Sequence, residues 1–429
     1  MNHSNLQARI AAAIPRGLSV AVPILAERAS NAEVWDSDGR RYIDFAGGIS
    51  VLNVGHRHPR VIAAVEEQLR KLTHTCFQVT PYEPYIRLAE RLNQIVPGAF
   101  SKKTILFSTG AEAVENAIKI ARCYTGRPAI IAFSGAFHGR TMMALALTGK
   151  MAPYKVGFGP MFPEVFHAPF PSPYRGVSTA DSLRALDALF MSAVDPARVA
   201  AIIIEPVQGE GGFHVAPFDF LRELRALCDR HGIVFVADEV QTGFGRTGRM
   251  FAVEHAGVAP DLIAMAKSLA GGFPLSAVTG RAEVMDAPAP GGLGGTYAGS
   301  PVACAAALAV LDVMKDENLL ARAENLGATV AQRLRAMRDG GRLQCIGDVR
   351  GLGAMQAMEL VNDHATKEPA PELAKKVVAN SAARGLIVIS CGVYSNVIRI
   401  MVPLTASAET VDEGLAILES ALADATAAG

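Results

Sequence analysis

Lys267 occupies a setting that is unusual for a lysine. It lies in the run DLIAMAKSLAGGFP, where it ends an apolar, strand-like stretch and is followed by glycines. Most lysines are solvated surface charges, and this context does not suit a surface residue. A lysine held in a partly apolar pocket has a lowered amine pKa, and a neutral amine forms a Schiff base with an aldehyde. Lys267 is therefore a candidate for covalent capture of a carbonyl compound.

Asp238 directly follows another apolar run, IVFVA. Ligands of open α/β sheets bind beyond the carboxyl ends of the strands, so an acid here would face a ligand. An acid in such a loop is equally often a helix N-cap, and this motif alone does not separate the two interpretations. Lys267 follows 29 positions later, which leaves room for one crossover between two neighbouring strands.

The run FSTGAEAVENAIKIAR has the signature of a helix start. Thr109 and Glu112 match a capping box ahead of strongly helical residues. The free N–H groups and the positive end of the helix dipole at Gly110 and Ala111 would suit a phosphate group. An isolated match of this kind is more often only a well-capped helix.

These three features supply what one cofactor requires. Pyridoxal 5'-phosphate (PLP) needs a lysine that captures its aldehyde, a seat for its phosphate and a carboxylate that keeps its pyridine nitrogen protonated. Lys267, the 109–112 motif and Asp238 offer these groups in turn. The sequence therefore predicts a PLP-binding enzyme.

The elements around these residues predict an α/β fold, because short apolar runs alternate with helical patterns through the middle of the chain. The runs at 199–204 and 233–237 have the length of buried strands, and the amphipathic stretch 219–231 separates them. Glycine and proline cluster at 288–295, where we expect a loop. Beyond residue 330 the pattern becomes mixed helix and short strand, which indicates a smaller C-terminal domain.

The composition indicates a globular protein with a small-molecule partner. The chain has 429 residues, 50% of them hydrophobic and 19% charged, enough to bury a large core. Lysine plus arginine and aspartate plus glutamate each number 41, so no charge excess favours nucleic acid or an anionic membrane. The six cysteines lack metal-binding spacing, and the longest helix-like apolar stretch, 301–314, is too short to span a bilayer. We therefore expect a cytoplasmic protein without a metal site.

An ordered series of motifs closely resembles the class III aminotransferases of PLP fold type I, and bacterial 4-aminobutyrate aminotransferases in particular. The resemblance runs from about residue 14 to residue 405 and includes DFAGGISVLNVGHRHP, THTCFQVTPYEPY, STGAEAVENA, FSGAFHGRT, EPVQGEGG, ADEVQTGFGRTG, AKSLAGGFPL, GGTYAGSP, GDVRGLGAM and NVIRIMVPL. It implies a large PLP-binding domain with a mostly parallel sheet at residues 56–315. Residues 316–429 would form a small α+β domain, joined by the N-terminal segment 1–55. The resemblance also implies a homodimer or a dimer of dimers.

Carried across position by position, the resemblance makes Lys267 the Schiff-base lysine and proton shuttle, and Asp238 the partner of the pyridine nitrogen. The other implied cofactor-binding positions are Val240 and Phe137 on the two ring faces, Gln241 at the ring hydroxyl, the amides of Gly110 and Ala111 at the phosphate, His138 beside Phe137, and Thr296, which would reach the phosphate of the neighbouring subunit. Many relatives have serine at position 111 and tyrosine at position 137. One phosphate hydroxyl and one phenol are therefore missing from this chain.

Arg399 lies in NVIRIMVPL, a run with the character of a strand. Val397 and Met401 would share its face, and Ile398 and Ile400 would point to the other. Both faces are apolar, so a buried arginine there needs an anionic partner. That partner is either a substrate carboxylate or the acid of a structural salt bridge.

The resemblance also implies a reaction and its substrate-binding residues. The expected reaction transfers the amino group of 4-aminobutyrate to 2-oxoglutarate, giving succinic semialdehyde and glutamate. Arg399 would bind the α-carboxylate of glutamate, Glu210 would pair with Arg399 when that carboxylate is absent, and Arg140 would bind the distal carboxylate. Glu205 and Ile49 would line the pocket.

Other activities remain open within and outside this family. A 5-aminovalerate preference is the main alternative, because one methylene changes discrimination by only about 1–3 kcal/mol. Ornithine-type aminotransferases and PLP-dependent mutases or decarboxylases are further alternatives.

The run GFGRTG at 243–248 matches the dinucleotide-binding pattern GxGxxG, and Asp261 follows at a suitable interval. Its context argues against an NAD-linked dehydrogenase, because DEVQT separates the glycines from the strand and no strong helix begins at Gly248. A non-catalytic binding protein would have no need of Lys267 beside a phosphate seat.

Overall fold

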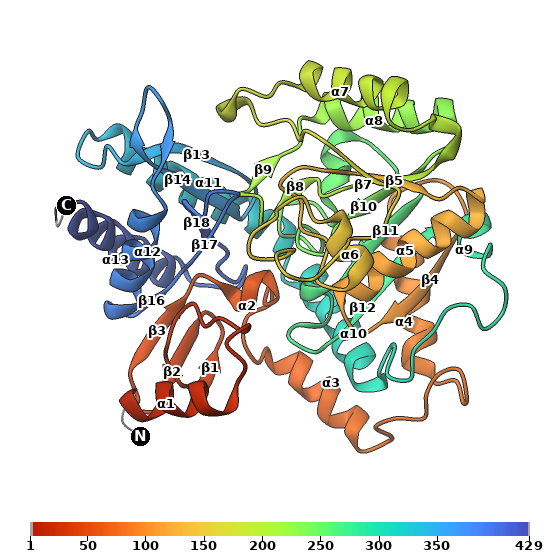
Figure 1. The fold of residues 1–429 in the computed structure, drawn as a ribbon. Helices are drawn as coiled ribbons and strands as arrows, with labels where there is room; N and C mark the ends of the chain where they lie inside the picture. Colours follow the sequence, from red (N-terminus) through yellow and green to blue (C-terminus); the bar gives the residue numbers. More distant parts are fainter. Residues whose placement is uncertain (1–2, 428–429) are drawn as a thin grey trace.

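The computed structural model describes residues 3–427 and shows two bodies side by side (Figure 1). The larger body is built on a seven-stranded sheet with the order β4-β12-β11-β10-β7-β5-β6. The run from β11 to β6 is parallel, and β12 is antiparallel to both of its neighbours. The strands are β4 (Lys102–Phe107), β5 (Ala129–Phe133), β6 (Val165–Ala168), β7 (Val199–Ile204), β10 (Val234–Asp238), β11 (Leu262–Met265) and β12 (Ser276–Arg281). The predicted α/β fold with a mostly parallel sheet is confirmed.

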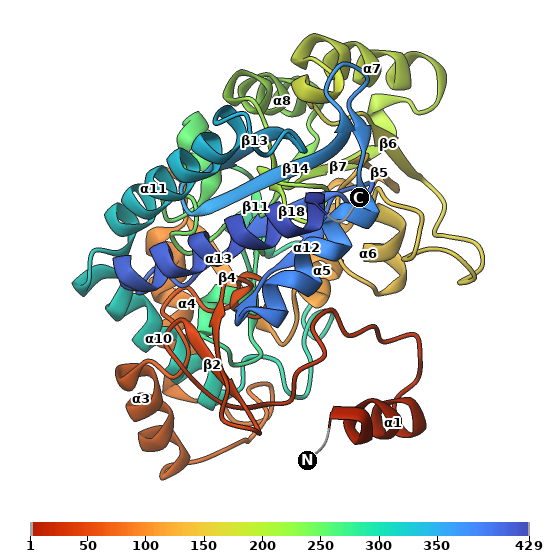
Figure 2. The same ribbon diagram turned by 90° about the vertical axis from the view of Figure 1, so that its left-hand side faces the viewer.

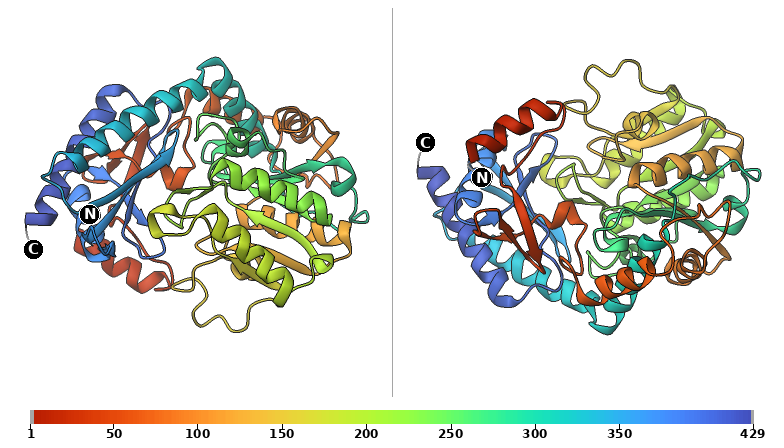
Figure 3. Two further views of the ribbon diagram at one scale, coloured as in Figure 1. Left: turned by 90° about the horizontal axis from the view of Figure 1, so that it is seen from above. Right: turned by 90° about the horizontal axis from the view of Figure 1, so that it is seen from below.

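The two faces of this sheet pack against different helices, because side chains alternate along each strand. In β7, Ile203 belongs to an apolar cluster with α5 (Gly110–Thr125). Its neighbour Ile202 belongs to the cluster on the other face, with α7 (Thr179–Ser192) and α8 (Phe218–His231). Figure 3 shows α7 and α8 in yellow-green on one face and α5 in orange on the other.

The predicted strand-helix-strand unit is confirmed. β7 covers the predicted residues 199–204, α8 follows it, and β10 pairs with β7 in parallel. All six side chains of β7 are buried, which explains why this strand is a continuous apolar run.

The smaller body contains two sheets covered by helices. One has the order β1-β2-β3-β16, and the other has the order β13-β14-β18-β17 with β15 paired to β14. Their strands are β1 (Ala26–Ser30), β2 (Glu33–Asp36), β3 (Arg41–Asp44), β13 (Ile346–Leu352), β14 (Met355–Asp363), β15 (Glu368–Pro369), β16 (Leu386–Ile387), β17 (Ile389–Cys391) and β18 (Val397–Ile400). In Figure 2, α11 (Leu319–Asp339), α12 (Pro371–Ala383) and α13 (Ala408–Ala427) lie beside β14 and β18, and their apolar side chains share one core with these strands.

The N-terminal strands belong to the smaller body, because β3 pairs in parallel with β16. This pairing supports the division of the chain after residues 55 and 315, which stays our proposal.

The other elements connect or cover the sheets. The remaining α-helices are α1 (His3–Ala13), α2 (Gly47–Ser50), α3 (Pro59–Leu69), α4 (Glu83–Ile95), α6 (Met142–Leu147), α9 (Ala282–Met285) and α10 (Pro301–Asp316), and a hairpin joins β8 (Val207–Gln208) to β9 (His214–Val215). The stretch 288–295 is a loop, as predicted. Among residues 3–427, no helix combines the length and the apolar character that a membrane span requires.

Candidate active site

Asp238 and Lys267 come together at one edge of the larger sheet. β10 ends at Asp238, and its parallel neighbour β11 ends at Met265, just before Lys267. The predicted crossover between two neighbouring strands is therefore confirmed. Because parallel strands bring their carboxyl ends to the same edge, the two side chains line one cavity.

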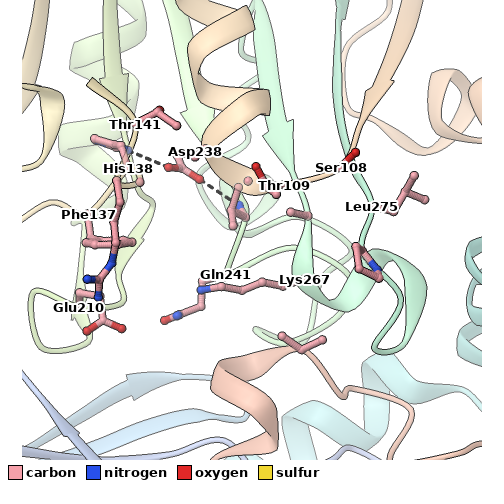
Figure 4. A pocket seen from close by; sticks show the side chains of 18 of the residues that line it. Ser108, Thr109, Phe137, His138, Thr141, Glu210, Asp238, Gln241, Lys267 and Leu275 are labelled. Atoms are coloured by element: carbon pink, nitrogen blue, oxygen red, sulfur yellow. Dashed lines mark hydrogen bonds and ion pairs between the residues drawn. The ribbon is translucent and has the colours of Figure 1, made fainter. Parts of the chain in front are cut away.

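This cavity has a volume of about 640 Å³ (Figure 4). It is lined by eleven residues selected from the sequence: Gly110, Ala111, Phe137, His138, Arg140, Glu205, Glu210, Asp238, Val240, Gln241 and Lys267. In Figure 4, Lys267 extends into the cavity from one side, and Phe137 and Glu210 lie together opposite it. The structure thus brings together most of the residues expected at the cofactor and the substrate.

Lys267 is held in an uncommon backbone conformation. Its φ is 48°, and such values are rare for non-glycine residues unless the surroundings enforce them. The next residue, Ser268, anchors the turn by donating a hydrogen bond from Oγ to the carbonyl of Ser50 at 2.9 Å. Burial lowers the pKa of the Lys267 amine, and the Glu210 carboxylate opposes this shift. The amine is therefore closer to the neutral form that attacks carbonyl carbons.

Asp238 is held through both carboxylate oxygens. Its Oδ2 lies 2.7 Å from Nδ1 of His138, and its Oδ1 accepts a hydrogen bond from the Val240 amide at 3.0 Å. The alternative of a helix N-cap does not apply, because Asp238 ends β10 and a turn follows it. Burial disfavours a charged imidazole, but the contact with Asp238 raises the pKa of His138. The contact with His138 therefore fixes the orientation of the Asp238 carboxylate.

Glu205 supports the wall of the cavity. Its Oε1 accepts a hydrogen bond from the Phe137 amide at 2.8 Å, and its Oε2 accepts one from the Gly209 amide at 3.0 Å. Burial raises the pKa of Glu205, and a charged His138 opposes this shift. Glu205 thus fixes the backbone that carries the Phe137 ring.

The helix start predicted from Thr109 and Glu112 is confirmed. The Glu112 amide donates to Thr109 Oγ1 at 3.2 Å, and the Thr109 amide donates to Glu112 Oε2 at 2.8 Å. Helix α5 then begins at Gly110, and its first N–H groups have no partner inside the helix. A Cβ on Gly110 would lie 2.9 Å from Cγ1 of Val240, so glycine lets Val240 approach this helix end. The arrangement suits a bound phosphate.

The cavity fits PLP, the cofactor expected from the sequence. Oε1 of Gln241 is buried and has no hydrogen-bond partner within the described residues, so a ligand that completes the site would satisfy it. The start of α5 offers an anion site, Asp238 offers a carboxylate and Lys267 offers an amine on the same cavity. These are the groups that PLP requires.

Arg399 reaches the cavity through Glu210. The two predicted faces of its strand are confirmed, since Val397 and Met401 belong to one apolar cluster and Ile398 and Ile400 to another. Its Nη1 donates to Oε1 of Glu210 at 2.5 Å.

The charges of this pair support each other. Burial alone would raise the pKa of Glu210, but the charge of Arg399 lowers it below its usual value. Burial alone would lower the pKa of Arg399, but Glu210 raises it. Both groups are therefore ionised, and the pair closes the far end of the cavity with its charges neutralised.

Tyr154 contacts the same end of the cavity, and it is not among the residues predicted from the sequence. Its hydroxyl donates to Oε2 of Glu210 at 3.4 Å, and the guanidinium carbon of Arg140 lies 5.0 Å from the centroid of its ring. Tyr154 belongs to the irregular segment 148–164 between α6 and β6. No periodic pattern distinguishes one residue from another there, so only the folded chain reveals the contact.

Three predicted site residues do not line the cavity: Arg399, which contacts it through Glu210, and Ile49 and Thr296. Ile49 is 45% exposed in a left-handed conformation, and Val51 lines the cavity nearby. Thr296 is exposed in the loop before α10. Their roles stay predictions.

The GFGRTG run does not form a strand-turn-helix nucleotide site. Arg246, within this run, is fully buried and donates a 2.7 Å hydrogen bond to the carbonyl of Val402. The run folds as turns, and the first helical residues after it form a short 3-10 helix at Ala252–Ala256. Across residues 3–427, no group of three or more His, Cys, Asp or Glu side chains could hold a metal ion.

Comparison with known proteins places this architecture in a family. The family model of the class III aminotransferases matches residues 16–422. The chain is 56% identical over 416 residues to a 5-aminovalerate aminotransferase, DavT, of Pseudomonas aeruginosa, with 97% of each chain covered. It is 55% identical over 424 residues to the 4-aminobutyrate aminotransferase GabT of Escherichia coli, with 99% of each covered. Among solved structures, it resembles a PLP-bound amine transaminase from an uncultivated Pseudomonas species, with a TM-score of 0.87, 32% identity and 96% of each chain covered.

The family match extends over nearly the whole chain, and the cavity carries the groups that PLP requires. The protein is therefore an enzyme of the class III aminotransferases, a family whose members use PLP as their cofactor.

Proposed function

We propose that this aminotransferase transfers the amino group of 4-aminobutyrate to 2-oxoglutarate, giving succinic semialdehyde and glutamate. The observation that carries the proposal is the closed pair of Arg399 and Glu210 at the end of a cavity that also contains Arg140. Two arginines, one of them covered by a removable carboxylate, suit a site that alternates between substrates with one and two carboxylates.

The residues at the centre of the cavity divide the chemical work. PLP, when bound, supplies the electron sink that accepts charge from the amine-bearing carbon of the substrate. Asp238 would partner the pyridine nitrogen of the cofactor and help to keep it protonated, and His138 keeps this carboxylate oriented. Lys267, with its lowered pKa, removes and returns the substrate proton as a general base and acid. The amides of Gly110 and Ala111, at the start of α5, would hold the phosphate.

The residues at the far end of the cavity select the substrate. Arg140 binds the carboxylate distant from the reacting amine or carbonyl, and its planar fork suits that group. 4-Aminobutyrate has no second carboxylate, so Glu210 stays on Arg399. With 2-oxoglutarate or glutamate, the α-carboxylate replaces Glu210 on Arg399. The pocket thereby accepts both partners of the reaction.

5-Aminovalerate is the second candidate donor, because relatives carrying either name share more than half of this sequence. The two donors differ by one methylene, which is worth about 1–3 kcal/mol in a pocket. We call the pair of Glu210 and Arg399 the gate: it is closed when Glu210 contacts Arg399 and open when a substrate α-carboxylate takes the place of Glu210. The closed gate suits 4-aminobutyrate and 5-aminovalerate equally. Ornithine-type donors remain a further alternative.

A panel of half-reactions tests the proposed function. The rate of cofactor conversion in single turnovers is measured with 4-aminobutyrate, 5-aminovalerate and ornithine as donors, and then with 2-oxoglutarate and pyruvate as acceptors. We expect the largest k/K among the donors for 4-aminobutyrate, and faster reaction with 2-oxoglutarate than with pyruvate. A larger k/K for 5-aminovalerate would reassign the donor. No reaction with any ω-amino acid would overturn the proposal.

The proposal includes an assembly and a location. We propose a homodimer or a dimer of dimers, in which Thr296 reaches the phosphate of the neighbouring subunit's cofactor. We also propose a cytoplasmic location, supported by six cysteines that are all unpaired.

A further inference from the structure

Tyr154 joins the two recognition groups at the far end of the cavity. Its hydroxyl lies 3.4 Å from Oε2 of Glu210. Its ring lies 5.0 Å, centroid to centroid, from the ring of Phe137, and the guanidinium carbon of Arg140 lies 5.0 Å from the same Tyr154 centroid. One side chain therefore contacts the residue that covers Arg399, the arginine proposed for the distal carboxylate, and the aromatic wall of the cavity.

The Glu210 carboxylate has a different partner on each oxygen. Arg399 donates to Oε1, and Tyr154 donates to Oε2. The backbone of Glu210 is fixed separately, because its carbonyl accepts a 2.9 Å hydrogen bond from the Gly392 amide. Uncovering Arg399 therefore requires rotation of the Glu210 side chain, and that rotation disturbs the contact with Tyr154.

The Tyr154 hydroxyl remains a donor at all ordinary pH values. Burial, and then the negative charge of Glu210, raise its pKa to about 12. The charge of Arg399 lowers the pKa of Glu210 and keeps this carboxylate ionised. The contact is thus a hydrogen bond from a neutral phenol to a carboxylate.

We propose that Tyr154 is a positioning residue that holds Glu210 on Arg399 and thereby favours amino donors with a single carboxylate. This inference rests on the proposed function, because it concerns the same gate. The hydroxyl stabilises the closed gate, whereas the ring supports Arg140 and Phe137 in both states. The two parts of the side chain therefore have separable effects.

The Tyr154 hydroxyl affects only the equilibrium between the closed gate, with Glu210 on Arg399, and the open gate. A hydrogen bond to a charged group is stronger than a neutral one, but 3.4 Å is long for such a bond. We therefore expect a shift of about threefold to tenfold in favour of the open gate when the hydroxyl is removed. Donors that need the closed gate should lose this factor relative to glutamate, which needs the open one.

Tyr154→Phe tests the hydroxyl alone. Single-turnover k/K values for 4-aminobutyrate and for glutamate are measured with the variant and the wild-type holoenzyme. The ratio of the two values should fall about threefold to tenfold, with k/K for glutamate unchanged or raised. Tyr154→Leu, which also removes the ring, should lower both values because Arg140 loses its support. Tyr124→Phe is the matched control, since Tyr124 is 48% exposed on α5 and does not line the cavity, and it should leave the ratio unchanged.

A binding measurement separates this inference from the proposed function. Pentanoate and glutarate have five carbons each and carry one and two carboxylates, and their dissociation constants with the holoenzyme are obtained by calorimetry. Tyr154→Phe should shift their ratio toward glutarate by the same factor, whether or not ω-amino acids are substrates. An unchanged ratio, or equal losses in both half-reactions, would overturn the role of Tyr154 even in an enzyme that converts 4-aminobutyrate. A shifted binding ratio in an enzyme that converts no ω-amino acid would support Tyr154 and overturn the proposed function.

Discussion

Glu210 and Arg399 are 189 residues apart in the chain, and their Oε1 and Nη1 atoms lie 2.5 Å apart in the structure. Only 3% of Arg399 is exposed, so an unpaired guanidinium there would lose its solvation without compensation. Apolar residues could not replace this pair, because Arg399 must also bind a substrate carboxylate. This relationship is the basis for the first prediction.

Removal of either partner should affect the two half-reactions unequally. Glu210→Ala leaves Arg399 uncovered when 4-aminobutyrate binds, so k/K for that donor should fall while glutamate keeps most of its rate. Arg399→Ala should do the reverse and damage glutamate and 2-oxoglutarate. Truncating one member of a buried charge pair typically costs about 2–5 kcal/mol, which single-turnover rates detect easily. Equal losses in both half-reactions for Glu210→Ala would reduce the pair to a structural salt bridge.

Lys267 should be the attachment point of the cofactor. Borohydride treatment of the holoenzyme, followed by digestion and mass spectrometry, should find the reduced cofactor on the peptide that contains Lys267. Lys150 provides an internal control, because burial lowers the pKa of its amine as well but its Nζ donates to the Gly392 carbonyl at 2.8 Å. Lys267→Arg should abolish the modification and the activity together. Modification of Lys150 or of any other lysine would contradict the assignment of Lys267.

Thr296 should act in the site of a neighbouring subunit. Lys267→Ala and Thr296→Ala chains are mixed under conditions of subunit exchange. If each site combines Lys267 of one subunit with Thr296 of another, a hybrid dimer contains one intact site. The mixture should then be more active than either parent. The test requires that Thr296→Ala alone is impaired and that exchange is demonstrated; absence of recovery under these conditions would place Thr296 outside a shared site.

His214 should make the fold sensitive to mild acid. Burial, and then the charge of Arg350, lower its pKa to about 3 from an ordinary value of 6.5. Below about pH 6.5 the unfolded chain therefore binds a proton that the folded protein does not, and stability falls as the pH drops. The loss amounts to about 1.4 kcal/mol per pH unit for this one group.

His214→Gln removes this titration and keeps a polar side chain near Ser172, whose Oγ lies 3.1 Å from His214 Nδ1. Scanning calorimetry between about pH 7.5 and pH 5 should show a smaller decrease of Tm for the variant than for the wild type. His364→Gln serves as the control, because His364 is exposed and its replacement should leave the pH dependence unchanged. Parallel curves for wild type and His214→Gln would show that His214 does not carry the effect.

Local patterns in the sequence determined the elements and the centre of the candidate site. β7 could be predicted because all six of its side chains are buried and it reads as a continuous apolar run. The capping box of Thr109 and Glu112 could be predicted because its hydrogen bonds join residues only three positions apart. Lys267 was recognisable because a lysine is rarely placed at the end of a buried strand. The resemblance to class III aminotransferases then supplied expected roles for Arg399, Glu210 and Arg140.

Only the tertiary structure decided how these residues meet. The contact of Tyr154 with Glu210 joins an irregular segment to the turn after β8, and no local pattern encodes which side chains of two distant segments will touch. The same holds for Arg399, whose burial on a strand could be inferred, but whose geometric pairing with Glu210 depends on how β18 packs beside the β8 hairpin. Propensity and periodicity act over a few residues, whereas side-chain contacts between distant segments depend on the path of the whole chain.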